Sequence, residues 1–116
     1  MGESKQHLRQ KERIRDLARA KGLVAENEIG FWCWSGYHNK PICYYADIFF
    51  IGQKVSPTIV ELDGPVGHGS KYQSKRDNRR SRDIRDTWGD NIKVHRFTLA
   101  ELKIASDEEI LEDLEL

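Results

Sequence analysis

Three acidic residues lie within two apolar stretches of the chain. Asp47 lies near the start of the run ADIFFI at 46–51, and Glu61 and Asp63 alternate with apolar residues in IVELD at 59–63. Side chains two residues apart share one face of a strand, so Glu61 and Asp63 are expected to point the same way. Neighbouring carboxylates repel, and a divalent cation with oxygen ligands relieves the repulsion. The pattern predicts a Mg²⁺ or Mn²⁺ site formed by Asp47, Glu61 and Asp63.

The alternative is a strand whose acids lie on a solvated face, which is the usual meaning of an isolated E-x-D sequence. The segment that follows favours the metal site. The loop GPVGHG at 64–69 brings His68 near the strand end, and a basic segment comes next. A histidine titrates near neutrality, so His68 is a candidate general base or acid. Its other interpretation is a loop histidine that binds backbone.

Spacing and turn residues predict seven elements. Ser4 and Gly22 delimit a helix over 5–20, and the Ser106–Glu109 capping box starts a short acidic helix within 106–116. The remaining elements are strands at 29–34, 42–51, 58–63 and 92–97 and a helix at 70–88. The order α-β-β-β-α-β-α indicates an α/β (α+β) fold with a mixed sheet flanked by helices. We expect one domain over 1–116, with its core at about 5–102.

The charge is balanced overall but unevenly distributed. Residues 1–100 carry 18 Lys or Arg against 12 Asp or Glu, whereas 101–116 carry one Lys and seven acids. A basic body of this kind attracts phosphate locally, which favours DNA as partner. No apolar run approaches the roughly 20 residues of a membrane span, and the N-terminus lacks a signal-peptide pattern. We therefore expect a cytoplasmic protein without a membrane partner.

The helix at 70–88 is rich in Lys and Arg. Lys75, Arg79 and Arg82 share one arc of the helix, which predicts contact with the DNA backbone. Arg76 and Arg80 lie in line with the apolar residues of the helix, so their stems are expected to run along its packed side. The predicted DNA-binding residues are Lys71, Arg79, Arg80 and Arg82. A solvated surface helix is the other interpretation.

Five motifs in order resemble the PD-(D/E)xK (restriction-endonuclease-like) nuclease superfamily, in the branch of very-short-patch-repair endonucleases and small related domains. They are Asp47, the strand Glu61-Leu62-Asp63-Gly64, His68, the helix segment Asp77-Asn78-Arg79-Arg80, and Val94-His95-Arg96-Phe97. The resemblance covers about residues 8–102. It implies a core of one helix, three strands, a helix and a strand, which is the order predicted above.

The resemblance also implies roles for single residues. Asp47 and Glu61 match metal-binding acids, and Asp63 stands where the usual signature has Lys. His68 matches a histidine near the scissile phosphate, and Glu12 resembles an acid that orients a metal-bound water. Charge at the site would come from Lys75, Asp77 and Arg80. The structural zinc cluster of the repair enzymes is not reproduced, and neither is their mismatch wedge.

The expected activity is metal-dependent hydrolysis of DNA phosphodiester bonds. The substrate is left open among duplex, nicked, branched and mismatched DNA, and so is a homodimer. A non-catalytic DNA-binding module on the same fold is the alternative, and a metal-free interaction protein is a third possibility. Intact Asp47, Glu61 and Asp63 favour the enzyme.

Two further groups of residues are ambiguous. Cys33, His38 and Cys43 include potential zinc ligands, but their spacing is not a standard one and a fourth ligand is missing. Buried strand cysteines are the other interpretation. An aromatic cluster forms either core or a base-stacking surface. Its members are Phe31, Trp32, Trp34, Tyr37, Tyr44 and Tyr45.

Overall fold

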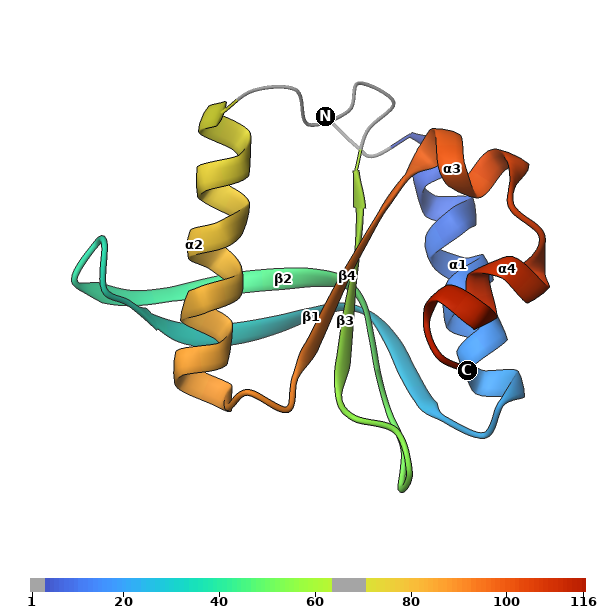
Figure 1. Ribbon diagram of the computed structural model, residues 1–116, viewed down its shortest axis with the longest axis horizontal. Helices are drawn as coiled ribbons and strands as arrows, with labels where there is room; N and C mark the ends of the chain where they lie inside the picture. The colour runs from blue at the N-terminus through green and yellow to red at the C-terminus, as the bar shows by residue number, and fades with distance from the viewer. Residues whose placement is uncertain (1–3, 64–70) are drawn as a thin grey trace.

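The protein is an α+β fold with a four-stranded mixed sheet flanked by helices (Figure 1). The computed structural model describes residues 4–63 and 71–116, with side chains over 4–63 and 78–116. Its elements, in chain order, are α1 (Lys5–Ala20), β1 (Val24–Ser35), β2 (Lys40–Ile51), β3 (Thr58–Asp63), α2 (Lys71–Trp88), β4 (Lys93–Thr98), α3 (Leu99–Ile104) and α4 (Asp107–Asp113).

The strands are arranged in sequence order. β1, β2 and β3 form an antiparallel meander, and β4 pairs parallel to β3. A parallel neighbour requires a crossover, and α2 provides it. The β1–β2 hairpin is long, since its register runs from Val24 opposite Ile51 to Ser35 opposite Lys40. Figure 1 shows its turn end extending past α2, away from β3 and β4.

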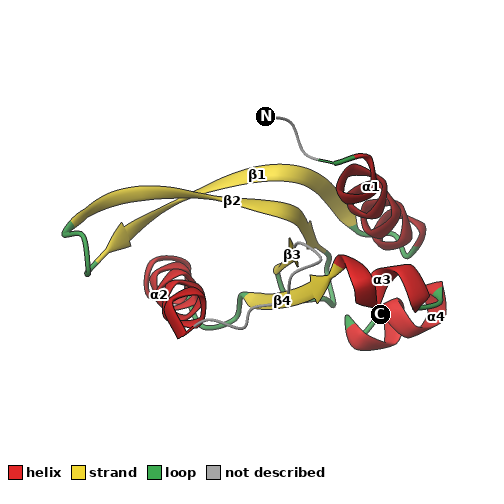
Figure 2. Ribbon diagram, turned by 90° about the horizontal axis from the view of Figure 1, so that it is seen from above, coloured by secondary structure: helices red, strands yellow, loops and turns green. Residues whose placement is uncertain are grey.

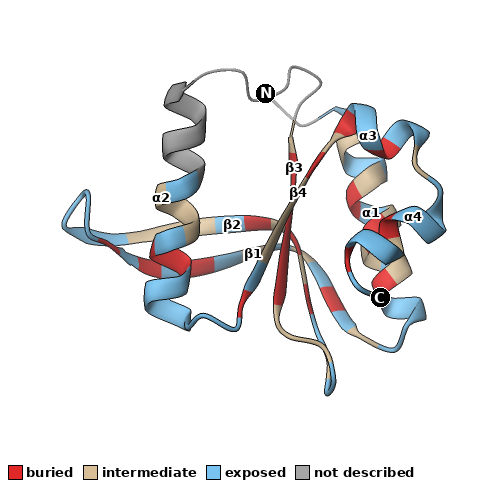
Figure 3. Ribbon diagram, viewed as in Figure 1, coloured by how far each residue is buried: buried red, intermediate tan, exposed pale blue. Residues whose placement is uncertain are grey.

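The two faces of the sheet carry separate hydrophobic clusters. On one face, residues of α1, α3 and α4 pack against the strands around Ile48, Phe50 and Val60. On the other, Ile84 of α2 packs against Phe31 and Ile59. Figure 2 shows α2 on one side of the hairpin and the other helices at its far end, and Figure 3 shows buried residues following β3 between them. Within the described residues, no helix is long and apolar enough to cross a membrane.

The alternation of β2 side chains between the two faces of the sheet is interrupted at Asp47. Ala46 and Ile48 would share a face in a regular strand, yet Ala46 packs in the α2 cluster and Ile48 in the α1 cluster. Glu28 precedes the pairing of Ile29 with Ala46, and its φ of 56° is unusual for a residue with a side chain. Asp47, one of the three predicted metal-binding acids, therefore lies where the hairpin passes from one hydrophobic cluster to the other.

Most predicted elements are confirmed. α1 has the predicted bounds, with the Ser4 side chain accepting from the His7 N–H, and β3 matches as well. β1 begins five residues earlier than expected, in the segment VAENE at 24–28. Its Asn27 side chain holds that segment by donating to the carbonyls of Lys11 and Asp47, at 3.3 Å each.

The C-terminal part holds two short helices instead of the one predicted. α4 begins at the predicted Ser106 capping box, and the additional helix α3 begins at a second box formed by Thr98 and Glu101. The acidic segment packs into the core, because Ile110 and Leu114 are buried. Arg13 of α1 holds the junction by donating to the carbonyls of Leu102 and Ala105, at 2.8 and 2.9 Å.

Candidate functional site

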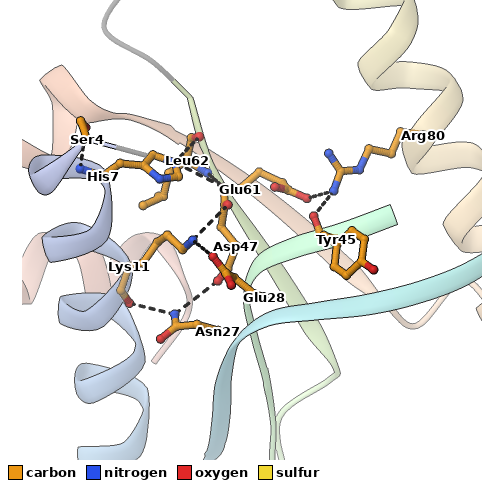
Figure 4. A network of polar contacts seen from close by, with 10 residues as sticks. All are labelled: Ser4, His7, Lys11, Asn27, Glu28, Tyr45, Asp47, Glu61, Leu62 and Arg80. Carbon is orange, nitrogen blue, oxygen red and sulfur yellow. Dashed lines mark hydrogen bonds and ion pairs between the residues drawn. The ribbon is translucent and has the colours of Figure 1, made fainter. Parts of the chain in front are cut away.

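The candidate site lies where β2 and β3 separate. Their ladder covers Ile48–Phe50 of β2 against 58–60 of β3, whereas β4 pairs with β3 through Asp63. Beyond the ladder, the Leu62 N–H donates to Asp47 Oδ2 at 2.7 Å. A side-chain carboxylate thus accepts the bond that a strand carbonyl would accept in a continued ladder. We call this opening, with Asp47 on β2 and Glu61 on β3, the fork (Figure 4).

Arg80 of α2 enters the fork from one side. Its Nη2 donates to the Tyr45 carbonyl on β2 and forms an ion pair with Glu61 Oε1 on β3. The guanidinium therefore bridges the two strands where they no longer pair (Figure 4). Its position confirms that the Arg80 stem runs along the packed side of the helix. Arg80 was also predicted to contact DNA, and that role stays a prediction.

Glu61 is a buried carboxyl with an unusual acidity. The residue is 5% exposed, and burial raises the pKa of its carboxyl to about 7. The Arg80 guanidinium works in the opposite direction, and Asp47 raises the pKa further through its charge and a hydrogen bond. Desolvation outweighs the ion pair, so the pKa of the Glu61 carboxyl lies above its usual value. Glu61 thus differs from a strand acid on a solvated face.

α1 approaches Asp47 from the other side with two basic residues. Lys11 is 2% exposed, and its Nζ lies 2.8 Å from Glu28 Oε1 and 3.9 Å from Asp47 Oδ1. His7, one turn earlier, places Nε2 at 3.2 Å from the Leu62 carbonyl and 3.8 Å from Asp47 Oδ2. A buried ammonium is costly unless it is paired, so Lys11 is fixed by these acids.

Sequence reasoning missed Lys11 and His7. Segment 5–20 is rich in charged residues, which is typical of a solvated helix surface, and Lys11 is one of them. The signal was its place in a helical stripe, because Lys11, Ile14 and Ala18 are the buried residues of α1 and follow the i, i+3, i+7 spacing of one face. His7 lies four residues before Lys11 and joins the same stripe.

The structure brings two of the three predicted metal-binding acids together. Asp47 and Glu61 meet at the fork, whereas Asp63 lies at the end of β3, half-buried and paired in register with Thr98. Across residues 4–63 and 78–116, no group of three His, Cys, Asp or Glu is arranged to hold a metal ion. The three-acid metal site therefore stays a prediction, and the structure shows only that Asp47 and Glu61 lie close together.

The other predicted site residues whose side chains the structure describes lie on α1 and α2. Glu12 is exposed on α1, next to the buried Lys11. On α2, Arg79 lies over the Tyr37 ring at 4.0 Å from its centroid, and Arg82 is exposed. His68 lies outside the described residues, and so do the side chains of the four α2 residues Lys71, Lys75, Arg76 and Asp77.

The two cysteines are free thiols that belong to opposite faces of the hairpin. Cys33 is buried under α2 and pairs in register with Ile42, whereas Cys43 pairs with Trp32. Cross-strand partners share a face and consecutive residues alternate, so the thiols point apart. This arrangement favours the interpretation as strand cysteines. Zinc binding by Cys33, His38 and Cys43 gains no support from the described residues.

A shallow groove of about 510 Å³ lies at the start of β4, at the opposite end of that strand from the fork. Ile92, Lys93 and His95 contribute to its lining, and it contains none of the predicted site residues. We place the candidate site at the fork, because charged groups from two strands and two helices converge there. Comparison with protein-family models, curated proteins and solved structures found no significant match to the chain.

Proposed function

We propose that the protein is a divalent-metal-dependent DNA endonuclease of the PD-(D/E)xK type, with its active centre at the fork. The observation that carries the proposal is the meeting of Asp47 and Glu61 at the point where β2 and β3 separate. Two carboxyls from neighbouring strands share this position, and one of them is buried. The element order through β4 is the order that the sequence resemblance implies.

The donor set of the fork suits a hard cation. Glu61 Oε1 is buried and, within the described part of the chain, accepts no hydrogen bond, its ion pair with Arg80 aside. Asp47 Oδ1 and the Leu62 carbonyl are further oxygens at the same place. Mg²⁺ binds through one or two carboxylates and retains several waters, so it needs no complete protein cage. Asp47 and Glu61 would hold the ion, which would supply Lewis acidity and a more acidic bound water.

The basic residues of the fork would act on the phosphate. Phosphodiester hydrolysis builds negative charge on the phosphate oxygens, and positioned cations stabilise that charge in the transition state. Asp63 occupies the place where the family signature has Lys. Lys11 of α1 instead brings an ammonium to Asp47, with its Nζ 3.9 Å from Asp47 Oδ1. We assign Lys11 this stabilising role, and Arg80 the role of positioning Glu61 against Tyr45.

The second candidate is a DNA-binding module without catalytic activity. The observation in its favour is that cations of the chain already accompany both acids, with Lys11 beside Asp47 and Arg80 beside Glu61. Such an arrangement neutralises the carboxylates without a metal. The two candidates differ in Mn²⁺ binding, because a non-catalytic module has no need of the ion.

The decisive experiment is incubation with supercoiled plasmid in Mg²⁺ or Mn²⁺, alongside a chelator control. We expect nicked or linear product in the metal arms only. Asp47→Asn and Glu61→Gln should abolish the product, whereas Asp16→Asn, which removes an exposed acid of α1, should leave it unchanged. Calorimetric Mn²⁺ binding that Asp47→Asn eliminates would complete the case. Absence of both cleavage and Mn²⁺ binding, with DNA binding retained, would support the non-catalytic module.

A further inference from the structure

Three aromatic side chains lie uncovered on one face of the β1–β2 hairpin. Trp32, Trp34 and Tyr45 are 65%, 53% and 65% exposed. Their neighbours in β1, Phe31 and Cys33, are buried against α2 on the opposite face. Figure 2 shows α2 on that opposite side, with α1 near the other end of the hairpin. Among the described elements, none packs over these three rings.

The three rings form a row along β1. Tyr45 pairs with Gly30, and a Cβ atom at Gly30 would lie 3.2 Å from Tyr45 Cε1. The Tyr45 ring thus occupies space next to the strand that a side chain at position 30 would need. Along β1, position 30, Trp32 and Trp34 are two residues apart from one to the next. Two residues of an antiparallel strand span about 6.8 Å. We call Trp34, Trp32 and Tyr45 the aromatic row.

The spacing of the row suits unstacked bases. Its step is about twice the 3.4 Å rise per base of a DNA strand in a duplex. The bases of a duplex stack directly on one another and leave no space for aromatic rings at this spacing. An extended single strand separates its bases and can place them on such rings. Aromatic side chains that present their faces to successive bases are the usual binding surface for single strands, and every base offers such a face.

The row leads directly to the fork. Tyr45 lies at one end of it, and the Tyr45 carbonyl accepts from the Arg80 guanidinium that pairs with Glu61. Asp47 follows two residues later on the same strand. An apolar interface with a second protein would be closed by a polar rim of its own. This row instead ends at Tyr45, whose own carbonyl contacts the Arg80 guanidinium of the proposed nuclease site.

We propose that the outer face of the β1–β2 hairpin binds single-stranded DNA, with one base on each ring of the row, and guides that strand to the fork. The proposal rests on the proposed nuclease function and narrows its substrate to DNA with an unpaired segment, such as a flap, overhang or bubble. A second copy of the chain is the competing occupant of the same surface.

The test measures binding without cleavage. Oligothymidylate labelled with a dye is titrated in chelator, with a duplex of equal length in parallel. We expect single-strand binding that quenches tryptophan fluorescence. Trp32→Ala and Trp34→Ala should each weaken it about five- to a hundredfold, while duplex binding changes little. Trp32→Phe should retain most of the affinity, and Ile104→Ala, at an exposed apolar residue of α3 outside the row, should retain all of it.

Several outcomes would overturn the proposal. Unchanged single-strand affinity in both tryptophan variants would do so, with circular dichroism checking their fold. A wild-type dimer in sedimentation that Trp32→Ala and Trp34→Ala dissociate would assign the row to self-association. The test is separable from the nuclease proposal. Plasmid cleavage that persists without single-strand binding would remove only the stacking surface, and single-strand binding without cleavage would remove only the nuclease.

Discussion

Asp47 Oδ2 accepts a hydrogen bond from the Leu62 backbone N–H at 2.7 Å, in place of a carbonyl of the neighbouring strand. One side chain thereby caps the open end of the β2–β3 ladder and contributes a carboxylate to the fork. The two roles have different chemical requirements, because the hydrogen bond to the Leu62 N–H needs only an oxygen acceptor whereas metal binding needs the negative charge.

Asparagine and alanine at position 47 should therefore separate stability from activity. Asp47→Asn retains an oxygen acceptor for the Leu62 N–H, so its free energy of unfolding should stay closer to wild type. Asp47→Ala leaves that N–H without its acceptor and should lose about 1–3 kcal/mol. Both should lose Mn²⁺ binding and cleavage. Urea unfolding and calorimetry measure the two properties, and equal stability losses would show that the hydrogen bond contributes little.

Glu61 should make the metal-free protein less stable at alkaline pH. Burial raises its pKa to about 7 from 4.5, so between these values the folded state binds more protons than the unfolded state. Its contribution to stability is present below pH 4.5 and lost as pH rises through about 7, by at most about 3 kcal/mol.

Unfolding in chelator from pH 4.5 to 8.5 measures this loss. Glu61→Gln is neutral at every pH and should remove this part of the slope. Glu101→Gln, at an exposed capping position, serves as the control for a general charge effect. A Glu61→Gln protein whose slope equals that of wild type would show that Glu61 is ionised throughout.

Lys11→Met should lower cleavage far more than it lowers DNA binding. Methionine preserves much of the buried stem, while the ammonium beside Asp47 and Glu28 is lost. Removing one positioned charge from an active centre costs about 10²–10³-fold in rate. Lys21→Met, at the exposed end of α1, is the matched control. Single-turnover rates with saturating protein test this directly, and a rate within twofold of wild type would make Lys11 a structural residue only.

The exposed side of α2 should contact the DNA backbone. Arg82 is exposed, and the Arg79 guanidinium is held over the Tyr37 ring. The double variant Arg79→Ala/Arg82→Ala should weaken binding equally on unrelated sequences and flatten the slope of log K against log salt by roughly one to two units. A salt series on two DNA duplexes measures this. An unchanged slope would make these arginines part of a solvated surface.

The local elements follow from the sequence by itself. Helix α1 is explained by residues close to it in the sequence. Ser4 caps its start, 5–20 contain no Gly or Pro, and Gly22 follows its end with a φ of 82°. The alternation of Glu61 and Asp63 with apolar residues likewise indicates β3. These features depend on groups within a few residues of each other, so a linear pattern carries them. α3 had such a pattern too, in Thr98 and Glu101, although it was not predicted.

The site depended on groups far apart in the chain, and only the tertiary structure decided it. A sequence pattern does not show that β2 and β3 separate at Asp47, because the separation depends on pairing between strands. The inward position of Lys11 depends on how α1 packs against β1 and β2. Arg80 enters the fork because α2 crosses the opposite face of the sheet. The sequence by itself indicates Asp47 and Glu61 as candidate site residues. The tertiary structure determines which residues they contact, how far they are buried and how the pKa of Glu61 is shifted.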